Sequence, residues 1–153
     1  MDREELLRRY AAGERDFTGV DLSEVKLFDV DLRNIILKDA DLSFAIMDMS
    51  RLMFADLSGS NMEGIMLSEA ALKGANLTGA ILIDARLIET YFRDANLSYV
   101  DFTGADLTDA YFGDANLSHA DLTAVDGFSL AMFKDAILDE TVMPDGSISA
   151  IAL

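Results

Sequence analysis

The sequence predicts an all-β solenoid, and two observations on a spacing of five residues carry that prediction. A large apolar residue occupies every fifth position from Phe17 to Leu122, which makes 22 consecutive positions filled by Leu, Phe or Met. From Leu22 onward, the position two residues before each of these holds only Ala, Val, Ile, Ser or Thr. Helices repeat apolar residues about every three to four positions and strands about every two, so a strict period of five indicates a repeat architecture instead.

Each five-residue unit is expected to form one short strand and one corner. The large residue at the centre of the unit and the small residue two positions earlier point inward, while the other three point outward. A type II turn at the corner needs a positive φ two positions after the centre. That slot holds six of the ten glycines of the chain and elsewhere often Asp or Asn, which tolerate this conformation best after Gly. Turn chemistry and burial pattern therefore agree.

The unit at residues 75–79 reads A-N-L-T-G and resembles the A-(D/N)-L-x-x motif of the pentapeptide-repeat family. The resemblance covers about residues 16–143, and the opening at residues 10–17 is similar to that of family members common in cyanobacteria. It implies a right-handed quadrilateral parallel β-helix, with four units in each coil and coils stacked at roughly 4.8 Å. The core of such a fold is narrow and filled by side chains. On this model Phe92 lies directly beneath Phe112.

Residues 1–15 are predicted to form a short N-terminal capping helix. Asp2 and Glu5 have the spacing of a capping pair, and Gly13 can end the helix. The open end of a β-helix exposes unpaired backbone groups, so we expect this helix to cover the first coil.

The period slips by one residue near the C-terminus. After Leu122 the next centres are Phe128, Phe133, Leu138 and Met143. We expect a bulge near residues 123–127, because Asp126 would otherwise point into an apolar core. The β-helix is then expected to end at residue 143. Residues 144–153 are expected to form a C-terminal tail or cap that begins with the turn Pro144-Asp145-Gly146.

Composition limits the classes of function. The 153 residues suit one domain, and the absence of Cys excludes disulfides and thiolate metal sites. The charged N-terminus is unlike a signal peptide and no long apolar run is present, so we expect a cytoplasmic protein without a membrane span. The net charge is −16, and residues 99–153 contribute ten acidic residues against one basic residue, Lys134. Direct binding to nucleic acid or to an anionic membrane is not expected, because both require cations.

No pattern in the sequence predicts catalysis. The one histidine, His119, falls in an outward corner slot, and no nucleophile motif accompanies it. Asp21 with Asp41, and Asp101 with Asp121, resemble paired carboxylates, but they recur because the motif recurs. We therefore predict a non-enzymatic protein with no catalytic, metal-binding or cofactor-binding residues.

Seven apolar residues fall in outward slots that the repeat leaves free to be polar, which favours a scaffold that binds a protein partner. We place them on the third face of the coil and its two flanking corners: Phe28, Phe44, Ile46, Met49, Met53, Phe54 and Met66. The alternative is that these side chains pack laterally on one another and shield the coil. The sequence does not identify the partner.

An acidic mimic of DNA is a second hypothesis, and it comes from the family resemblance. Some pentapeptide-repeat proteins bind type II topoisomerases such as gyrase through an acidic rod, usually as dimers joined at the C-terminal end. A rod of roughly 31 Å with this net charge carries about one charge per 2 Å, close to about one per 1.7 Å in duplex DNA. Against this hypothesis, the motif itself is acidic and the coil lacks the projecting loops of some such members. A monomer and a C-terminal-end homodimer both remain open.

Overall fold

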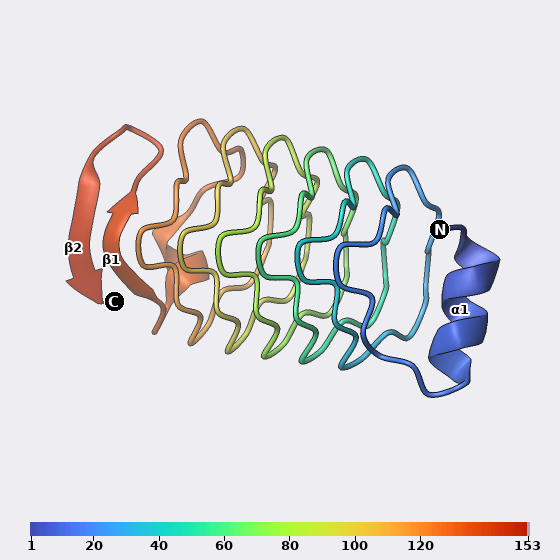
Figure 1. The fold of residues 1–153 in the computed structure, drawn as a ribbon. Coiled ribbons are helices and arrows are strands. Elements are labelled where there is room, and N and C mark those ends of the chain that lie inside the picture. The colour runs from blue at the N-terminus through green and yellow to red at the C-terminus, as the bar shows by residue number, and fades with distance from the viewer. Residues whose placement is uncertain (153) are drawn as a thin grey trace.

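The chain forms a stack of four-sided coils that runs from a helix at one end to a β-hairpin at the other (Figure 1). The computed structural model describes the backbone of residues 1–152 and the side chains of residues 1–149. Parallel β-bridges join residues 20 positions apart, from Asp16–Ile36 to Asp106–Asp126. Because successive bridges begin five residues apart, each coil has four faces.

We number the faces by their bridge residue in the first coil. Face one begins at Asp16, face two at Asp21, face three at Lys26 and face four at Asp31. The first coil spans residues 16–35, and each later coil adds 20 residues. The bridges connect the residues that the five-residue period predicts to stack.

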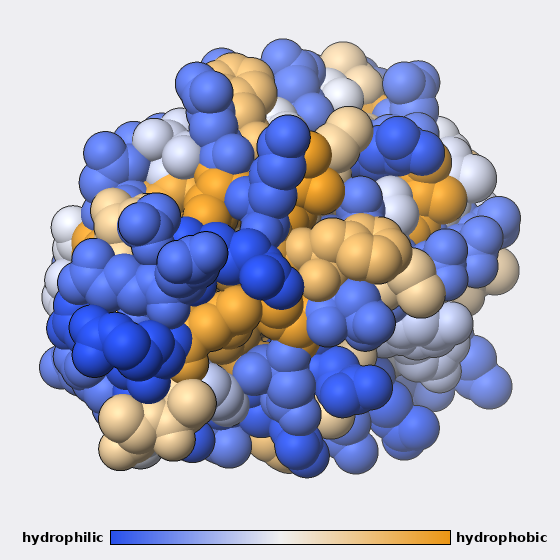
Figure 2. Space-filling model, turned by 90° about the vertical axis from the view of Figure 1, so that its right-hand side faces the viewer, coloured by the Kyte–Doolittle hydropathy of each residue, from blue (hydrophilic) through white to orange (hydrophobic). Residues whose placement is uncertain are grey.

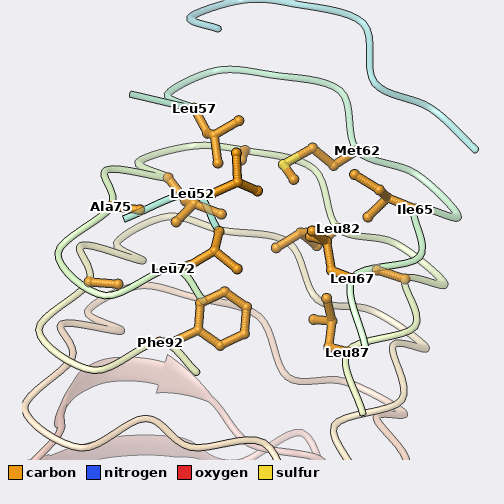
Figure 3. Close-up of a cluster of buried hydrophobic side chains, with 14 of the residues drawn as sticks. Leu52, Leu57, Met62, Ile65, Leu67, Leu72, Ala75, Leu82, Leu87 and Phe92 are labelled. Atoms are coloured by element: carbon orange, nitrogen blue, oxygen red, sulfur yellow. The ribbon is translucent and has the colours of Figure 1, made fainter. Parts of the chain in front are cut away.

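Inward side chains fill the interior of the stack (Figure 3). The large residues at the unit centres are all at most 3% exposed from Phe17 to Leu122. The predicted stacking of Phe92 on Phe112 is confirmed, with ring centroids 5.1 Å apart and planes 9° apart. Where a small inward residue is polar, its hydroxyl finds a backbone acceptor, as when Ser50 donates to the Leu27 carbonyl at 2.7 Å. The core therefore pairs its polar groups as buried polar groups require.

Helix α1 spans Arg3–Ala11 and lies across the N-terminal end of the stack (Figure 1). The Asp2 carboxylate accepts a hydrogen bond from the Glu5 backbone N–H at 2.8 Å, the N-cap geometry that the sequence indicates. Leu6 is fully buried against the core. The helix ends at Ala11 with Ala12 as its C-cap, and Gly13 follows with a φ of 98°.

The C-terminal end is closed differently. A short 3-10 helix, η1, spans Leu130–Phe133, and strand β1 spans Ile137–Val142. Strand β1 extends the bridges of faces one and two through Ile137 and Val142. Strand β2, Ile148–Ala152, pairs antiparallel with β1. Leu153, the last residue of the predicted tail, lies outside the described residues.

The break in the repeat falls at Gly127, the last residue of the range 123–127, and not at Asp126. Val125 keeps the small inward slot and Asp126 keeps the bridge slot, where its N–H donates to the Ala105 carbonyl at 2.9 Å. Gly127 then falls at the position of a core centre, and a Cβ there would lie 2.6 Å from the Thr108 backbone. The chain therefore leaves the repeat at Gly127 and returns at Phe133, whose ring stacks on Phe112 at 4.8 Å.

Candidate functional site

The corners of the coil impose a left-handed backbone on the residue two positions after each centre. Every such residue from Gly19 to Ala124 has a positive φ, including Phe44 at 56°, Met49 at 61° and Phe54 at 59°. This conformation costs a non-glycine residue roughly 1–2 kcal/mol, and Asn or Asp bear it best. Folding alone therefore gives no reason to place bulky apolar residues there.

Five of the seven predicted surface residues gather around face three, and we call them the face-three patch: Phe28, Phe44, Ile46, Met49 and Met66. Ile46 and Met66 form one rung of the face-three bridge ladder and are half-buried. Phe44 and Met49 stand at the two corners that bound the face and are 56% and 44% exposed. Phe28 precedes one of these corners in the first coil and is 55% exposed.

Met53 and Phe54 lie elsewhere, so the seven residues do not form one surface. They stand at the corner after face four, ten residues beyond Phe44, which is half of a 20-residue coil. Phe44 and Phe54 therefore occupy opposite corners. Counting five residues per side gives this result from the sequence alone, so the predicted placement of Met53 and Phe54 beside face three is wrong.

The rings of Phe44 and Phe54 each cover a glycine of the next coil. A Cβ at Gly64 would lie 2.5 Å from the Phe44 ring, and a Cβ at Gly74 would lie 2.6 Å from the Phe54 ring. One edge of each ring therefore occupies the space that a larger residue would need in place of the glycine. Both side chains nevertheless stay more than half exposed.

Charges are unevenly distributed around the coil. Face two carries acids in most of its bridge slots: Asp21, Asp41, Asp101 and Asp121. Cations gather instead on face four and the corner that follows it: Arg33, Arg51, Lys73 and Arg93. Exposed Tyr91 and Tyr111 form a rung of the same face, which sequence reasoning did not select. The signal was available, since reading the bridge slots 20 residues apart brings both tyrosines together.

Hydrogen bonds within the units hold the carboxylates of the ladder. The Asp21 carboxylate accepts from the Ser23 hydroxyl at 2.7 Å and from the Ser23 N–H at 3.0 Å. Asp16 makes the same two bonds to Thr18. These hydrogen bonds, led by the one from the hydroxyl, hold the pKa of both carboxyl groups below the usual value. These carboxylates thus stabilise the turns of their own units in addition to making the surface negatively charged.

His119 belongs to a corner ladder. Its ring stacks on Tyr99 with centroids 4.6 Å apart, and its Nδ1 lies 3.0 Å from the Glu140 carboxylate. Within residues 1–152, no group of three or more His, Asp or Glu side chains could hold a metal ion. No helix in the same part of the chain is long and apolar enough to cross a membrane.

A shallow apolar hollow of about 300 Å³ lies at the C-terminal end, lined by Phe128, Leu130, Met143, Pro144, Asp145 and Ser147. It is formed where the break in the repeat meets the turn before β2.

Comparison with known proteins defines the family. Eight copies of the pentapeptide-repeat model match the chain, over residues 35–74, 70–109, 85–123 and 101–143. No curated protein sequence is significantly similar.

Among solved structures, Rfr23, a pentapeptide repeat protein from the cyanobacterium Cyanothece 51142, is 25% identical over 80% of this chain and 93% of its own, with a TM-score of 0.53. HetL, a pentapeptide repeat protein involved in heterocyst differentiation regulation from the cyanobacterium Nostoc sp. strain PCC 7120, is 29% identical over 97% of this chain and 100% of its own, with a TM-score of 0.34. QnrB1, a plasmid-mediated fluoroquinolone resistance protein, is 22% identical over 73% of this chain and 72% of its own, with a TM-score of 0.42. With repeats that match the family model over most of its length, the chain belongs to the pentapeptide-repeat family, whose fold is a right-handed β-helix.

Proposed function

We propose that this protein is a non-catalytic scaffold that binds a protein partner through the face-three patch. One observation carries the proposal: Phe44 and Met49 are large, exposed and apolar in slots whose positive φ disfavours them. A solenoid whose coils need only two inward residues per unit has no folding use for them. Exposed apolar surface carries a risk of aggregation, and a role in binding a partner explains why apolar residues are present there in spite of that risk.

The composition of the patch suits an adaptable contact. Methionine side chains are flexible and polarizable, and aromatic rings supply large contact areas. Phe44 and Phe28 contribute the rings, while Met49 and Met66 lie beside them. The rigid coil keeps the four residues in a fixed arrangement, which lowers the entropic cost of binding.

Affinity capture from the cell of origin tests the proposal with a matched pair of variants. Phe44→Ser removes a ring from the patch, whereas Phe54→Ser removes an equally exposed ring from the opposite corner. Both rings cover a glycine and both residues have a positive φ, so both variants should lose the same small amount of stability. We expect a captured protein to disappear with Phe44→Ser and Met49→Ser and to remain with Phe54→Ser. Equal capture by all variants would show that the contact lies outside the patch.

The acidic ladders support a second candidate function, binding to a DNA-binding protein such as gyrase as a mimic of DNA. The supporting observation is the run of carboxylates on face two, held in place by the hydrogen bonds of their own units. Because cations gather on face four, such a mimic would present only part of its circumference.

A further inference from the structure

The coils follow one hydrogen-bonding rule, and the first coil cannot complete it. Each bridge residue directs both backbone groups toward the preceding coil. Ile46, for example, donates its N–H to the Val25 carbonyl at 2.8 Å and accepts from the Leu27 N–H at 2.7 Å. The residue after each centre also turns its carbonyl to the preceding coil, as when Asp48 accepts from the Asp29 N–H at 3.0 Å. The first coil has no coil before it, so its equivalent groups form an open sheet edge.

The N-terminal segment with helix α1 supplies hydrogen-bond partners to only some of the backbone groups along this edge. The α-amino group of Met1 donates to the Asp21 carbonyl at 2.7 Å, and the Tyr10 hydroxyl donates to the Arg33 carbonyl at 2.8 Å. Between these two points lie the N–H and carbonyl of Lys26, the carbonyl of Phe28, and the N–H and carbonyl of Asp31. None of these five groups has a hydrogen-bond partner among residues 1–152.

Apolar surface accompanies the open edge. Val25 is half-buried at this end and Phe28 is 55% exposed. Figure 2 looks onto the N-terminal end and shows hydrophobic surface between hydrophilic side chains. The open edge on face three is continuous with the face-three patch, because Phe28 belongs to both. Unpaired backbone groups beside apolar surface are the two features that an added strand requires.

We propose that the partner docks by adding an extended segment to the first coil along face three, as a strand that takes the place of a preceding coil. This inference rests on the proposed function and specifies how the partner of the face-three patch binds. An N–H of the segment donates to the Lys26 carbonyl, a carbonyl two residues earlier accepts from the Lys26 N–H, and an N–H two residues later donates to the Phe28 carbonyl. This arrangement repeats the pattern between the first and second coils.

Charge on the edge specifies the segment further. The Lys26 side chain is exposed and forms no ion pair among the described residues. Cations and carboxylates in bridge slots one coil apart come within reach of each other, as Arg51 and Asp31 do at 3.7 Å. An acidic residue in the segment's bridge slot therefore complements Lys26. The segment that fits best reads small, acidic, large apolar.

A peptide titration followed by NMR tests the inference. The probe is a synthetic, acetylated peptide with the sequence of residues 99–110, which contains two units of the required pattern. Added to the ¹⁵N-labelled protein, it should shift the amide resonances of residues 25–31, while a scrambled peptide should not. Lys26→Pro should weaken binding by about tenfold or more, because it removes the donor and places a proline ring on the edge. Lys26→Ala keeps the N–H and should weaken binding less.

The outcomes separate this inference from the proposed function. If the peptide causes no shifts at millimolar concentration, or shifts residues away from the first coil, the edge is not a binding site. If Lys26→Pro leaves capture of the cellular partner intact while Phe44→Ser abolishes it, the patch binds the partner without strand addition. If Lys26→Pro instead abolishes a self-association detected by sedimentation, the occupant is a second copy of the chain, and the assignment to a partner segment is wrong.

Discussion

The contribution of a residue to the stability of this protein depends on its position in the five-residue unit. Leu77 is a fully buried centre, and the next residue, Thr78, is outward and half-buried. The Thr78 hydroxyl donates to the Asn76 side chain at 2.7 Å, so this outward residue still contributes to its turn. The same substitution at Leu77 and at Thr78 should therefore have different effects on stability.

Leu77→Asp should unfold the protein, because an unpaired charge in the core costs several kcal/mol. Thr78→Asp introduces the same carboxylate outside and should cost about 1 kcal/mol or less, the value of the lost hydrogen bond. Thermal unfolding followed by circular dichroism measures both. A folded Leu77→Asp variant would mean that the centre slots tolerate water, contrary to the packed core.

Met49→Asn tests whether the exposed apolar residues serve folding. Asn tolerates the φ of 61° better than Met does, so the variant should melt at the same temperature or higher. Differential scanning calorimetry provides the measurement, with Asp29→Asn, in the same corner slot of the preceding coil, as a control that removes no apolar side chain. A melting temperature several degrees lower only for Met49→Asn would show that its side chain packs against the coil and is structural.

The elements of this fold are ladders of β-bridges. A residue inside a ladder contributes more hydrogen bonds to stability than a residue at the end of one. Ile46 and Lys26 occupy the same slot of face three in successive coils. The Ile46 N–H is hydrogen-bonded to Val25, whereas the Lys26 N–H faces the open edge. Proline at the two positions therefore distinguishes an interior rung from an edge.

Ile46→Pro should lower the melting temperature strongly, because it removes a ladder hydrogen bond and forces a ring against the preceding coil. Lys26→Pro should leave the melting temperature nearly unchanged, since no hydrogen bond within the chain is lost. The two variants are compared by thermal unfolding under identical conditions. Equal destabilisation would mean that the first coil is held at this edge by contacts additional to those described.

Asp21 in the first coil gives the fold a defined response to pH. The pKa of the Asp21 carboxyl is lowered in the folded protein, mainly by the hydrogen bond from the Ser23 hydroxyl. A lowered pKa means that the group stabilises the fold above the unfolded value of about 3.9, and that this stabilisation is lost as pH falls through the folded pKa. The melting temperature should therefore drop between about pH 5 and pH 2. Asp21→Asn keeps the acceptor oxygen but does not titrate, so its melting temperature should drop less; an equal drop would assign the effect to other groups.

The whole molecule combines a rigid rod with an uneven distribution of charge and apolar surface. Acids follow face two, cations follow face four, and the apolar patch lies on face three between them. These surfaces are kept apart by the coil itself, because five residues of sequence turn the chain by one side. The two candidate functions thus depend on different faces of the coil, and substitutions can test them separately.

If the acidic ladders mimic DNA, the purified protein should inhibit DNA supercoiling by gyrase. The inhibition should weaken steeply as salt rises, because the interaction between exposed charges is screened. Replacing Asp101 and Asp121 on face two by Asn should reduce potency, whereas the same replacement at Asp94 and Asp114, at the corner after face four, should not. Failure to inhibit at low salt and high protein excess removes this function and leaves the scaffold proposal unaffected.

The sequence by itself determined the coil. The 22 centres repeat without exception, as do the 21 small residues from Val20 to Ala120, and each unit needs only its own turn and its neighbour one coil away. The period therefore predicted the faces, the buried core and the stack of Phe92 on Phe112, because these follow from counting residues.

Tertiary structure decided the features that break or end the period. The chain leaves the repeat at Gly127, where the close approach to the Thr108 backbone leaves no room for a Cβ, a contact between coils that no local pattern reveals. The opposite corners of Phe44 and Phe54 were within reach of counting, but the cover that their rings give to Gly64 and Gly74 required coordinates. The open edge at Lys26 is also a tertiary fact, since it depends on where α1 crosses the first coil and which carbonyls its side chains reach. The repeated sequence determines how each coil packs and hydrogen-bonds to the next. Only the packing at the ends of the stack shows which backbone groups remain unpaired and available to a partner.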